Sequence, residues 1–231
     1  MKTSALVVAA GSGTRLGREE PKAFVPINDT SLLLRVLRTI RMVDGLDEIV
    51  MAVPAGAQQR ARAEIEAAEI QIPVKITEGG AERQDSVRLA LMLTSAEADL
   101  VLVHDAARPF ATREMFSECM AAALESGGAI VAIPVADTLK QVNRNVIVST
   151  MPRDGLWQAQ TPQAFQRQLL VRAHQRAISE GIRVTDDADL CERIGITLRV
   201  VRGSPFNFKI TTADDLKIAE AVAAWQGQSA E

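Results

Sequence analysis

Aromatic side chains are scarce in this sequence, making up 3% of its 231 residues, with six Phe, two Trp and no Tyr. So few rings disfavour the stacking platforms on which proteins bind single-stranded nucleic acid. Positive charge is not in excess either, because 26 Lys and Arg face 29 Asp and Glu for a net charge of −3. This balance disfavours a general nucleic-acid binder. No apolar run approaches the ~20 residues of a membrane span, and the apolar start meets glycines too soon for a signal peptide. We therefore expect a cytoplasmic protein that binds neither nucleic acid nor membrane.

Cysteine and histidine are also too few to build a zinc site. Cys119 and Cys191 stand alone, without a CxxC spacing, and only two His accompany them. A zinc site therefore has almost no ligands to draw on, and both thiols are expected to be reduced and to lie on helices. The remaining composition, 47% hydrophobic and 24% charged, is typical of a globular protein.

Apolar strand-like segments alternate with helix-like segments along most of the chain. The strand-like segments are residues 5–10, 48–53, 74–77, 100–104, 129–135 and 197–201. The helix-like segments are residues 31–42, 57–68, 86–93, 112–125, 166–180, 186–194 and 213–225, the last with Thr211 or Thr212 as its N-cap. Strands that are apolar throughout and alternate with helices predict an α/β fold, with a mostly parallel sheet covered by helices on both faces.

Residues 136–160 interrupt this alternation, because they have no helical period. Residues 138–142 and 146–150 flank Asn143-Arg144-Asn145, a pattern that predicts a β-hairpin. An isolated hairpin is marginally stable in water. We therefore expect it to project from the domain and pack on a second copy of the chain as a dimerisation arm. Addition to the edge of the main sheet is the alternative.

The first expected strand runs into a glycine-rich loop, residues 9–17, which is followed by Pro21 and Lys22. A loop after a parallel strand lies at the sheet edge where ligands bind, and glycines let backbone amides approach phosphate oxygens. The dinucleotide fingerprint would need Gly or Ala where Leu16 stands, and no P-loop ending follows. The loop offers two cations instead, Arg15 and Lys22, although a glycine turn with solvated charges is the alternative.

Two further strand ends carry candidate site residues. Gly79 and Gly80 precede Ser86 at a helix start, where Ser86 or Asp85 could equally be an N-cap. The strand that ends at Asp105 places a carboxylate at the mouth of the sheet. A carboxylate beside phosphates suits Mg²⁺, while an ion pair with Arg108, three residues on, is the alternative. His104 is expected to be a packed or hydrogen-bonded structural residue.

Polar segments in the second half of the chain add candidate ligands for an anion. Thr185 opens the segment TDDA, where it could instead be a helix N-cap, and Lys209 lies in a polar loop. Several cations stand near expected strand ends or loops, although the chain as a whole is acidic; they are Arg15, Lys22, Arg83, Arg153 and Lys209. This distribution predicts a locally positive cleft for a polyanionic ligand.

Taken in order, a set of motifs resembles the 2-C-methyl-D-erythritol 4-phosphate cytidylyltransferase family of the non-mevalonate isoprenoid pathway. The motifs are AAGSGTRLG with PK, GGAERQDSV, VHDAARP, DTLK, DGLWQAQTPQAF, TDDA and GSPFNFKIT. The resemblance runs from about residue 4 to about residue 221. It implies a single Rossmann-like nucleotidyltransferase domain over residues 1–231, with an arm at about 136–160 that joins a homodimer. It further implies that CTP and the sugar phosphate give 4-diphosphocytidyl-2-C-methyl-D-erythritol and pyrophosphate, with Mg²⁺ or another divalent cation.

The resemblance also implies a role for each matched residue. Arg15 and Lys22 would be catalytic, holding the triphosphate and the transition state. The nucleotide would be surrounded by Ala9, Ala10, Gly11, Gly13, Gly79, Gly80, Ser86 and Asp105, and Asp105 would also meet the metal. The sugar phosphate would be bound by Thr138, Arg153, Thr161, Thr185 and Lys209.

This chemistry suits a sequence without a convincing Ser-His-Asp or Cys-His set. A phosphate monoester, whose second pKa is about 6, is already largely dianionic at neutral pH and needs no general base. A ribitol-5-phosphate cytidylyltransferase remains a close alternative. A nicotinamide-dependent dehydrogenase is disfavoured by Leu16, Lys22 and Asp105, and a catalytically silent nucleotide-binding module should have lost one of the phosphate-binding cations.

Overall fold

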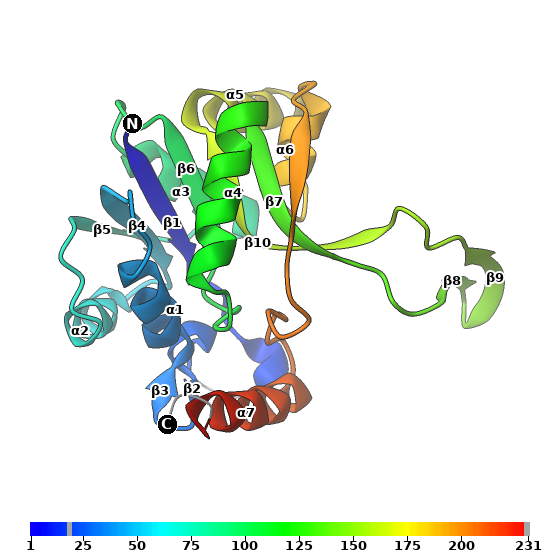
Figure 1. Cartoon of the computed structure of the whole chain (residues 1–231), viewed down its shortest axis with the longest axis horizontal. Helices are drawn as coiled ribbons and strands as arrows, with labels where there is room; N and C mark the ends of the chain where they lie inside the picture. Colours follow the sequence, from blue (N-terminus) through cyan, green and yellow to red (C-terminus); the bar gives the residue numbers. More distant parts are fainter. Residues whose placement is uncertain (18–19, 229–231) are drawn as a thin grey trace.

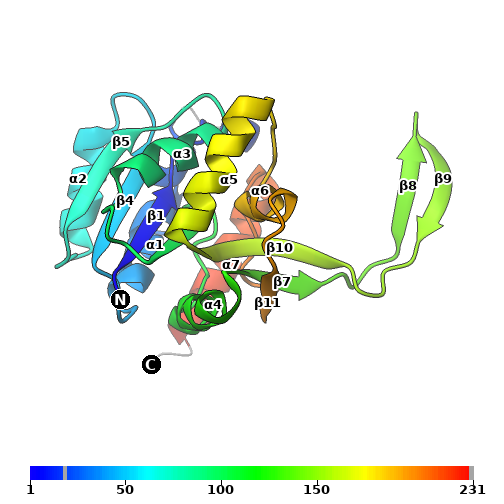
Figure 2. The same ribbon diagram turned by 90° about the horizontal axis from the view of Figure 1, so that it is seen from above.

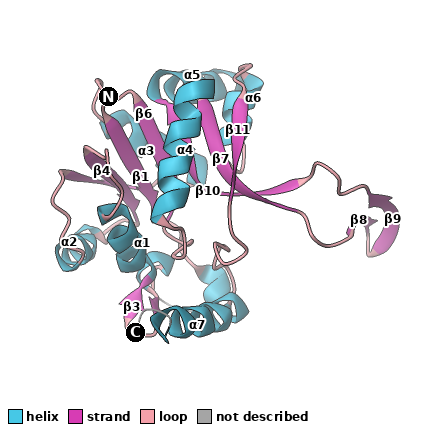
Figure 3. Ribbon diagram, viewed as in Figure 1, coloured by secondary structure: helices cyan, strands magenta, loops and turns pink. Residues whose placement is uncertain are grey.

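A seven-stranded sheet forms the centre of the fold in a computed structural model that describes residues 1–17 and 20–228 (Figures 1 and 3). The strand order is β11-β7-β10-β6-β1-β4-β5, and every pairing is parallel except those of β10 with its two neighbours. The strands are β1 (Thr3–Val8), β4 (Glu48–Val53), β5 (Val74–Glu78), β6 (Leu100–Asp105), β7 (Gly128–Pro134), β10 (Trp157–Gln166) and β11 (Leu198–Arg202).

Helices cover both faces of the sheet because successive strand residues point to opposite sides. In β1, Ala5 and Val7 pack in one apolar cluster and Leu6 in the other. Helices α1 (Leu32–Arg41), α2 (Gln58–Ala67) and α4 (Arg113–Ser126) contribute to the first cluster. Helices α3 (Arg83–Leu93), α5 (Arg167–Glu180) and α6 (Asp187–Arg193) contribute to the second (Figure 2). The predicted α/β architecture is therefore confirmed, and the free thiols of Cys119 and Cys191 are buried on α4 and α6 as expected.

Helix α7 (Ala213–Gln228) lies at the carboxyl end of the sheet and closes a third apolar cluster (Figure 1). Leu216 and Ala219 of α7 are buried with Leu16 of the first loop and Ile210. Thr212 caps the helix, accepting a hydrogen bond from the Asp215 amide while the Asp215 carboxylate accepts from the Thr212 amide. Across the described part of the chain, no helix is long and apolar enough to cross a bilayer.

Three short elements connect the first loop to α1. They are the 3₁₀ turns η1 (Thr14–Leu16) and η2 (Lys22–Phe24) and the small hairpin of β2 (Pro26–Ile27) with β3 (Thr30–Ser31). Phe24 and Ile27 are buried, as is Leu16. This segment is therefore packed onto the domain on both sides of the undescribed residues 18–19.

Strand β10 is the element that the sequence pattern did not predict. Its middle contains buried polar side chains, Gln160, Thr161 and Gln163, and a proline at position 162. Such a composition is atypical of an interior strand, yet β10 lies between β6 and β7 and is antiparallel to both. Its pairing begins at Trp157, so the arm is shorter than the predicted 136–160.

The predicted hairpin forms as β8 (Leu139–Asn143) and β9 (Val146–Met151), joined at Arg144 and Asn145. Both turn residues have positive φ, 46° and 65°, as a two-residue type I′ turn requires. The hairpin is a separate two-stranded sheet, so the alternative of an edge addition is wrong. It extends well away from the body of the molecule (Figures 1 and 2).

Candidate active site

The candidate site lies where the order of the strands reverses direction. From β1 the chain adds β4 and then β5 on one side, whereas β6 pairs on the other side of β1. Ligands bind in the crevice at such a switch point, beyond the carboxyl ends of the strands. Val8 and Asp105, the last residues of β1 and β6, are directly paired. A cavity of about 120 Å³ opens there, lined by Val8, Ala9, Gly11, Lys22, Ala23, Arg83, Asp105, Ala106, Ala107 and Lys209.

The glycine-rich loop folds back so that its backbone touches Lys22. Gly13 has φ of 73°, in the left-handed region that favours glycine. A Cβ atom at Gly13 would lie only 2.8 Å from the Lys22 Cβ, so a larger residue would displace the lysine. Leu16 is buried beneath α7 and anchors the loop, which leaves Arg15 exposed.

Lys22 is a half-buried ammonium in cationic surroundings. Burial, the neighbouring charge of Lys209 and that of Arg15 lower its pKa to about 8, against the opposing effect of Asp105. Among the described residues the structure gives its ammonium no hydrogen bond or ion pair. A desolvated cation of this kind at the mouth of a cavity is suited to binding an anion.

Asp105 is the acidic side chain of the cavity, and two cations hold it. Arg83 Nε lies 2.8 Å from its Oδ1, and Lys209 Nζ lies 2.7 Å from its Oδ2. Burial alone would raise the pKa of Asp105, but the charges of Arg83 and Lys209 hold that pKa well below its usual range. The alternative ion pair with Arg108 is wrong, since that guanidinium donates to two backbone carbonyls elsewhere. Asp105 is thus a fully ionised carboxylate in a fixed position.

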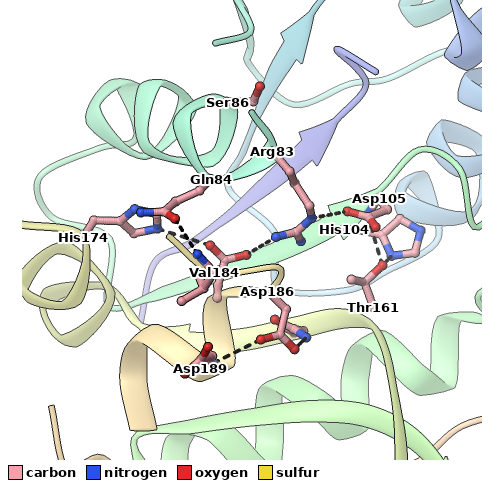
Figure 4. A network of polar contacts seen from close by, with 12 residues as sticks. Arg83, Gln84, Ser86, His104, Asp105, Thr161, His174, Val184, Asp186 and Asp189 are labelled. Carbon is pink, nitrogen blue, oxygen red and sulfur yellow. Dashed lines mark hydrogen bonds and ion pairs between the residues drawn. The ribbon is translucent and has the colours of Figure 1, made fainter. Parts of the chain in front are cut away.

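Besides Asp105, Arg83 contacts a buried pair of side chains, Asp187 and His174 (Figure 4). Its Nη1 lies 2.7 Å from Asp187 Oδ2, while Asp187 Oδ1 bonds to His174 Nε2 at 3.2 Å. The remaining Arg83 nitrogen, Nη2, is buried and has no hydrogen-bond partner within the described part of the chain. Sequence reasoning noted Arg83 as one cation of the cleft but gave no role to His174 or Asp187. Asp187 lies within the TDDA motif but was not singled out there, and no motif contained His174.

Thr161 lies behind Asp105 rather than on the cavity surface. Its Oγ accepts from the Asp105 amide at 3.0 Å and lies 3.0 Å from His104 Nδ1 (Figure 4). His104 Nε2 lies 3.1 Å from the Arg108 carbonyl, which can only accept, so Nε2 carries the proton and Thr161 donates to Nδ1. Burial lowers the pKa of His104 to about 4 and keeps the ring neutral. His104 is therefore a structural residue, as predicted.

The second glycine loop packs tightly against the first. A Cβ atom at Gly79 would lie 2.1 Å from the Ala10 Cβ, and one at Gly80 2.3 Å from the Asp85 Cβ. Ser86 lies inside α3, where its hydroxyl accepts from the Gly80 amide and donates to the Glu82 carbonyl, both at 3.1 Å. Ser86 is not the N-cap, and neither is Asp85, because Glu82 occupies that position.

The structure separates the expected acceptor ligands. Thr185 is exposed and lies two residues before α6. Asp186, which accepts from the Asp189 amide, is the N-cap in its place. Thr138 lies at the base of the arm, and Arg153 beyond β9 donates to the Ala136 carbonyl. Neither arm residue lines the cavity of its own chain.

Comparison with known proteins agrees with this geometry. The family model for 2-C-methyl-D-erythritol 4-phosphate cytidylyltransferase matches residues 3–224. Proteins of that name from Deinococcus radiodurans and Symbiobacterium thermophilum are 44% and 43% identical, covering 96% and 94% of this chain and 89% and 91% of their own.

Solved structures are similar over almost the whole chain. The Thermus thermophilus cytidylyltransferase of the same name superposes with a TM-score of 0.82 at 36% identity, over 97% of this chain and 100% of its own. The 4-diphosphocytidyl-2C-methyl-D-erythritol synthase of Anaerococcus prevotii gives 0.85 at 29% identity, over 96% of both chains. The chain belongs to the 2-C-methyl-D-erythritol 4-phosphate cytidylyltransferase family, as its motifs predict.

Proposed function

We propose that the cavity between β1 and β6 carries out the reaction of this family with the residues described above. The chain transfers a cytidylyl group from CTP to 2-C-methyl-D-erythritol 4-phosphate, giving 4-diphosphocytidyl-2-C-methyl-D-erythritol and pyrophosphate. The observation that carries the proposal is the half-buried Lys22 ammonium beside Asp105 and Lys209, at the switch point of the sheet.

The two glycine loops supply the nucleotide-binding surface. Ala9 and Gly11 line the cavity. The residues packed beside this loop and the second glycine loop would complete the contact with the nucleotide; they are Ala10, Gly13, Gly79, Gly80 and Ser86. Backbone amides and a missing Cβ suit close approach to a base or a phosphate. Arg15 would clamp the triphosphate with its planar guanidinium, and Lys22 would place a compact charge on the α-phosphate.

The Asp105 carboxylate of the cavity fits a magnesium ion that would be held mainly by the nucleotide. The described residues form no group of three or more acidic, histidine or cysteine side chains able to hold a metal. Mg²⁺ commonly takes one or two carboxylates and completes its shell with phosphates and water. Each Asp105 oxygen accepts one bond from Arg83 or Lys209 and keeps a further lone pair, so Asp105 would hold the ion. When bound, Mg²⁺ neutralises charge on the triphosphate.

The acceptor phosphate would meet cations from two subunits. Lys209 lines the cavity of one subunit, and Thr161 supports Asp105 from behind. Thr185, which does not line that cavity in the described structure, would bind the acceptor from the segment before α6. Thr138 and Arg153 lie on the arm, whose Val142, Val146 and Ile147 are exposed in the single chain. A projecting apolar hairpin is suited to packing on a second copy. We propose a homodimer in which each arm delivers Thr138 and Arg153 to the partner's site.

The chemistry is an in-line displacement that needs no general base. The attacking phosphate is already dianionic at neutral pH, so the cations must chiefly overcome repulsion between two anions. Lys22, Arg15, Lys209 and the incoming Arg153 would align the acceptor and stabilise charge as it grows on the α-phosphate.

Pyrophosphate release tests the proposal, measured with CTP and Mg²⁺ and with each of two acceptors in turn. We expect rapid release with 2-C-methyl-D-erythritol 4-phosphate. We expect little release with ribitol 5-phosphate, because the similar proteins are named for the methylerythritol acceptor. Comparable release with both acceptors, or with neither, would overturn the acceptor assignment. A cytoplasmic location stays a prediction.

A further inference from the structure

The first turn of α3 connects three segments that are far apart in the sequence. Ser86 holds the Gly80 amide of the nucleotide loop. Arg83 joins Asp105, at the end of β6, to Asp187 of α6. Between them Gln84, only 8% exposed, binds the chain that leads from α5 to α6. One helical turn therefore bonds to both halves of the site.

Both ends of the Gln84 amide are used on the same short segment, and Figure 4 shows the contact with Val184. Its Nε2 donates to the Ile182 carbonyl at 3.1 Å, and its Oε1 accepts from the Val184 amide at 3.0 Å. Because a carbonyl only accepts and an amide only donates, this fixes the orientation of the side-chain amide. Gln84 thereby hydrogen-bonds to the backbone of residues 182 and 184 in the way that a neighbouring β-strand would.

Thr185 follows this anchored pair directly and is itself exposed. On its other side, Asp186 caps α6 and accepts from Gln163 Nε2 at 3.3 Å, and Asp187 is held by Arg83. The Thr185 position is thus fixed from both flanks while its side chain stays accessible.

Two side chains of α3, Gln84 and Asp85, contact the segment before Thr185, and they make different kinds of contact. Gln84 is buried and bonds directly to the backbone of residues 182 and 184. Asp85 instead pairs with the exposed side chain of Arg183 at 3.1 Å. An exposed ion pair contributes little and leaves the backbone free to shift. The Ile182 amide also donates to the Ala177 carbonyl at 2.9 Å. Gln84 therefore supplies the direct side-chain hydrogen bonds that tie this backbone to α3.

We infer that Gln84 is a positioning residue for the acceptor half of the reaction. It fixes the backbone before Thr185 so that this hydroxyl meets the sugar phosphate, and it ties that segment to the helix that also holds the nucleotide loop. The inference rests on the proposed function, because it requires Thr185 to contact the acceptor. Small displacements of a substrate-orienting group cost large factors in rate or binding.

The test compares Gln84→Leu with wild type in steady-state kinetics and in amide hydrogen exchange. Gln84→Leu removes both hydrogen bonds at similar side-chain volume. We expect KM for the sugar phosphate to rise about tenfold or more, KM for CTP to stay within about twofold, and exchange to accelerate at the 182–187 amides.

Thr94→Val is the matched control at the far end of the same helix. Thr94 is buried and also makes two hydrogen bonds, to the Leu91 carbonyl and from Arg167 Nε, but at the end of α3 remote from the cavity. It should change neither KM. If Gln84→Leu does not fold, Gln84→Glu provides a second test. It keeps the acceptor for the Val184 amide, and the same two KM values are compared with those of wild type.

The outcomes separate the two proposals. Wild-type enzyme that fails to transfer cytidylyl to this acceptor would remove the proposed function, whatever the exchange data show. With an active wild type, an equal rise in both KM values would make Gln84 a general structural residue. Faster exchange at 182–187 without any rise in the acceptor KM would show that this segment does not serve the acceptor, and would also overturn the inference.

Discussion

The Lys209 ammonium lies 2.7 Å from Asp105 Oδ2, although 104 residues separate the two in the chain. Lys209 follows β11 at one end of the sheet, and Asp105 ends β6 near the middle. The contact therefore joins the loop after β11 to the carboxyl end of β6 across the cleft. Since Arg83 holds the other Asp105 oxygen, the two cations keep the pKa of this carboxyl well below its usual range.

Asp105→Asn should weaken the response to the metal. The substitution keeps the size of the side chain but removes the negative charge that pairs with Arg83 and Lys209 and that would hold the proposed Mg²⁺. We expect a severalfold higher Mg²⁺ concentration at half-maximal rate and a lower kcat. The measurement is a Mg²⁺ titration at saturating CTP. Glu97→Gln, which alters an exposed acid paired with Lys2, is the control. A superimposable titration for Asp105→Asn would assign this carboxylate to structure alone.

Lys22→Met should lower kcat by about 10²–10³, the usual effect of losing one electrostatic stabiliser of a transition state. It should not lower thermal stability. The pKa of Lys22 falls on folding, to about 8, so below that pH the charged amine opposes folding and its removal relieves a cost. Steady-state turnover near neutral pH checks the expected fall in kcat. The melting temperature of the ligand-free protein at the same pH checks the expected stability. A kcat within a few-fold of wild type would contradict the catalytic role.

The same lysine predicts a pH profile. The pH dependence of kcat/KM for CTP reports groups of the free enzyme, where Lys22 has a pKa of about 8. Its cation is lost as pH rises through that value, so kcat/KM should decline above about pH 8. Lys22→Arg keeps its charge to about pH 12, so its residual activity should stay level across that decline. A decline at the same pH in both enzymes would place the titration on another group.

Thr161 provides a stability test that separates support from substrate binding. Thr161→Val leaves the buried Asp105 amide and His104 Nδ1 without their partner, which should cost about 1–3 kcal/mol in the free energy of unfolding. Thr161→Ser keeps the hydroxyl and should lose far less. Urea denaturation compares the two. Equal stability of the Val and Ser variants would mean that these two hydrogen bonds contribute little.

The sequence predicted the parts of this site that follow from strand ends. Parallel strands end at one edge of the sheet, so the Gly11 loop, the Gly79 loop and Asp105 had to meet there. Strand β10 was missed because Pro162 and the glutamines around it look unlike an interior strand. The side-chain nitrogens of the buried Gln160 and Gln163 find partners, such as Gln160 Nε2 with the Ser204 carbonyl at 2.9 Å.

Pairings between distant helices could not be predicted from local pattern. The ion pair of Arg83 with Asp187 depends on how α3 and α6 sit on one face of the sheet, which no spacing in a single sequence encodes. The choice between Thr185 and Asp186 as the cap of α6 likewise depends on backbone angles, because both residue types are good caps.

The arm predicts that activity can be shared between subunits. Lys22 lies in the cleft of the domain, whereas Arg153 lies at the base of the arm and lines no part of that cleft in its own chain. If Arg153 serves the partner's site, Lys22→Ala and Arg153→Ala each inactivate their homodimers by different lesions. In a mixed dimer, the subunit with an intact Lys22 receives an intact Arg153 from its partner, which gives one good site of two.

Mixing the two inactive variants and allowing subunit exchange measures this directly. Random exchange makes about half of the dimers mixed, so about a quarter of wild-type activity should return. If Arg153 acts within its own subunit, every site keeps one lesion and mixing restores nothing. Native mass spectrometry must show the mixed dimer in both cases. Confirmed exchange without recovered activity would remove Arg153 from the partner's site, and the arm would then serve assembly alone.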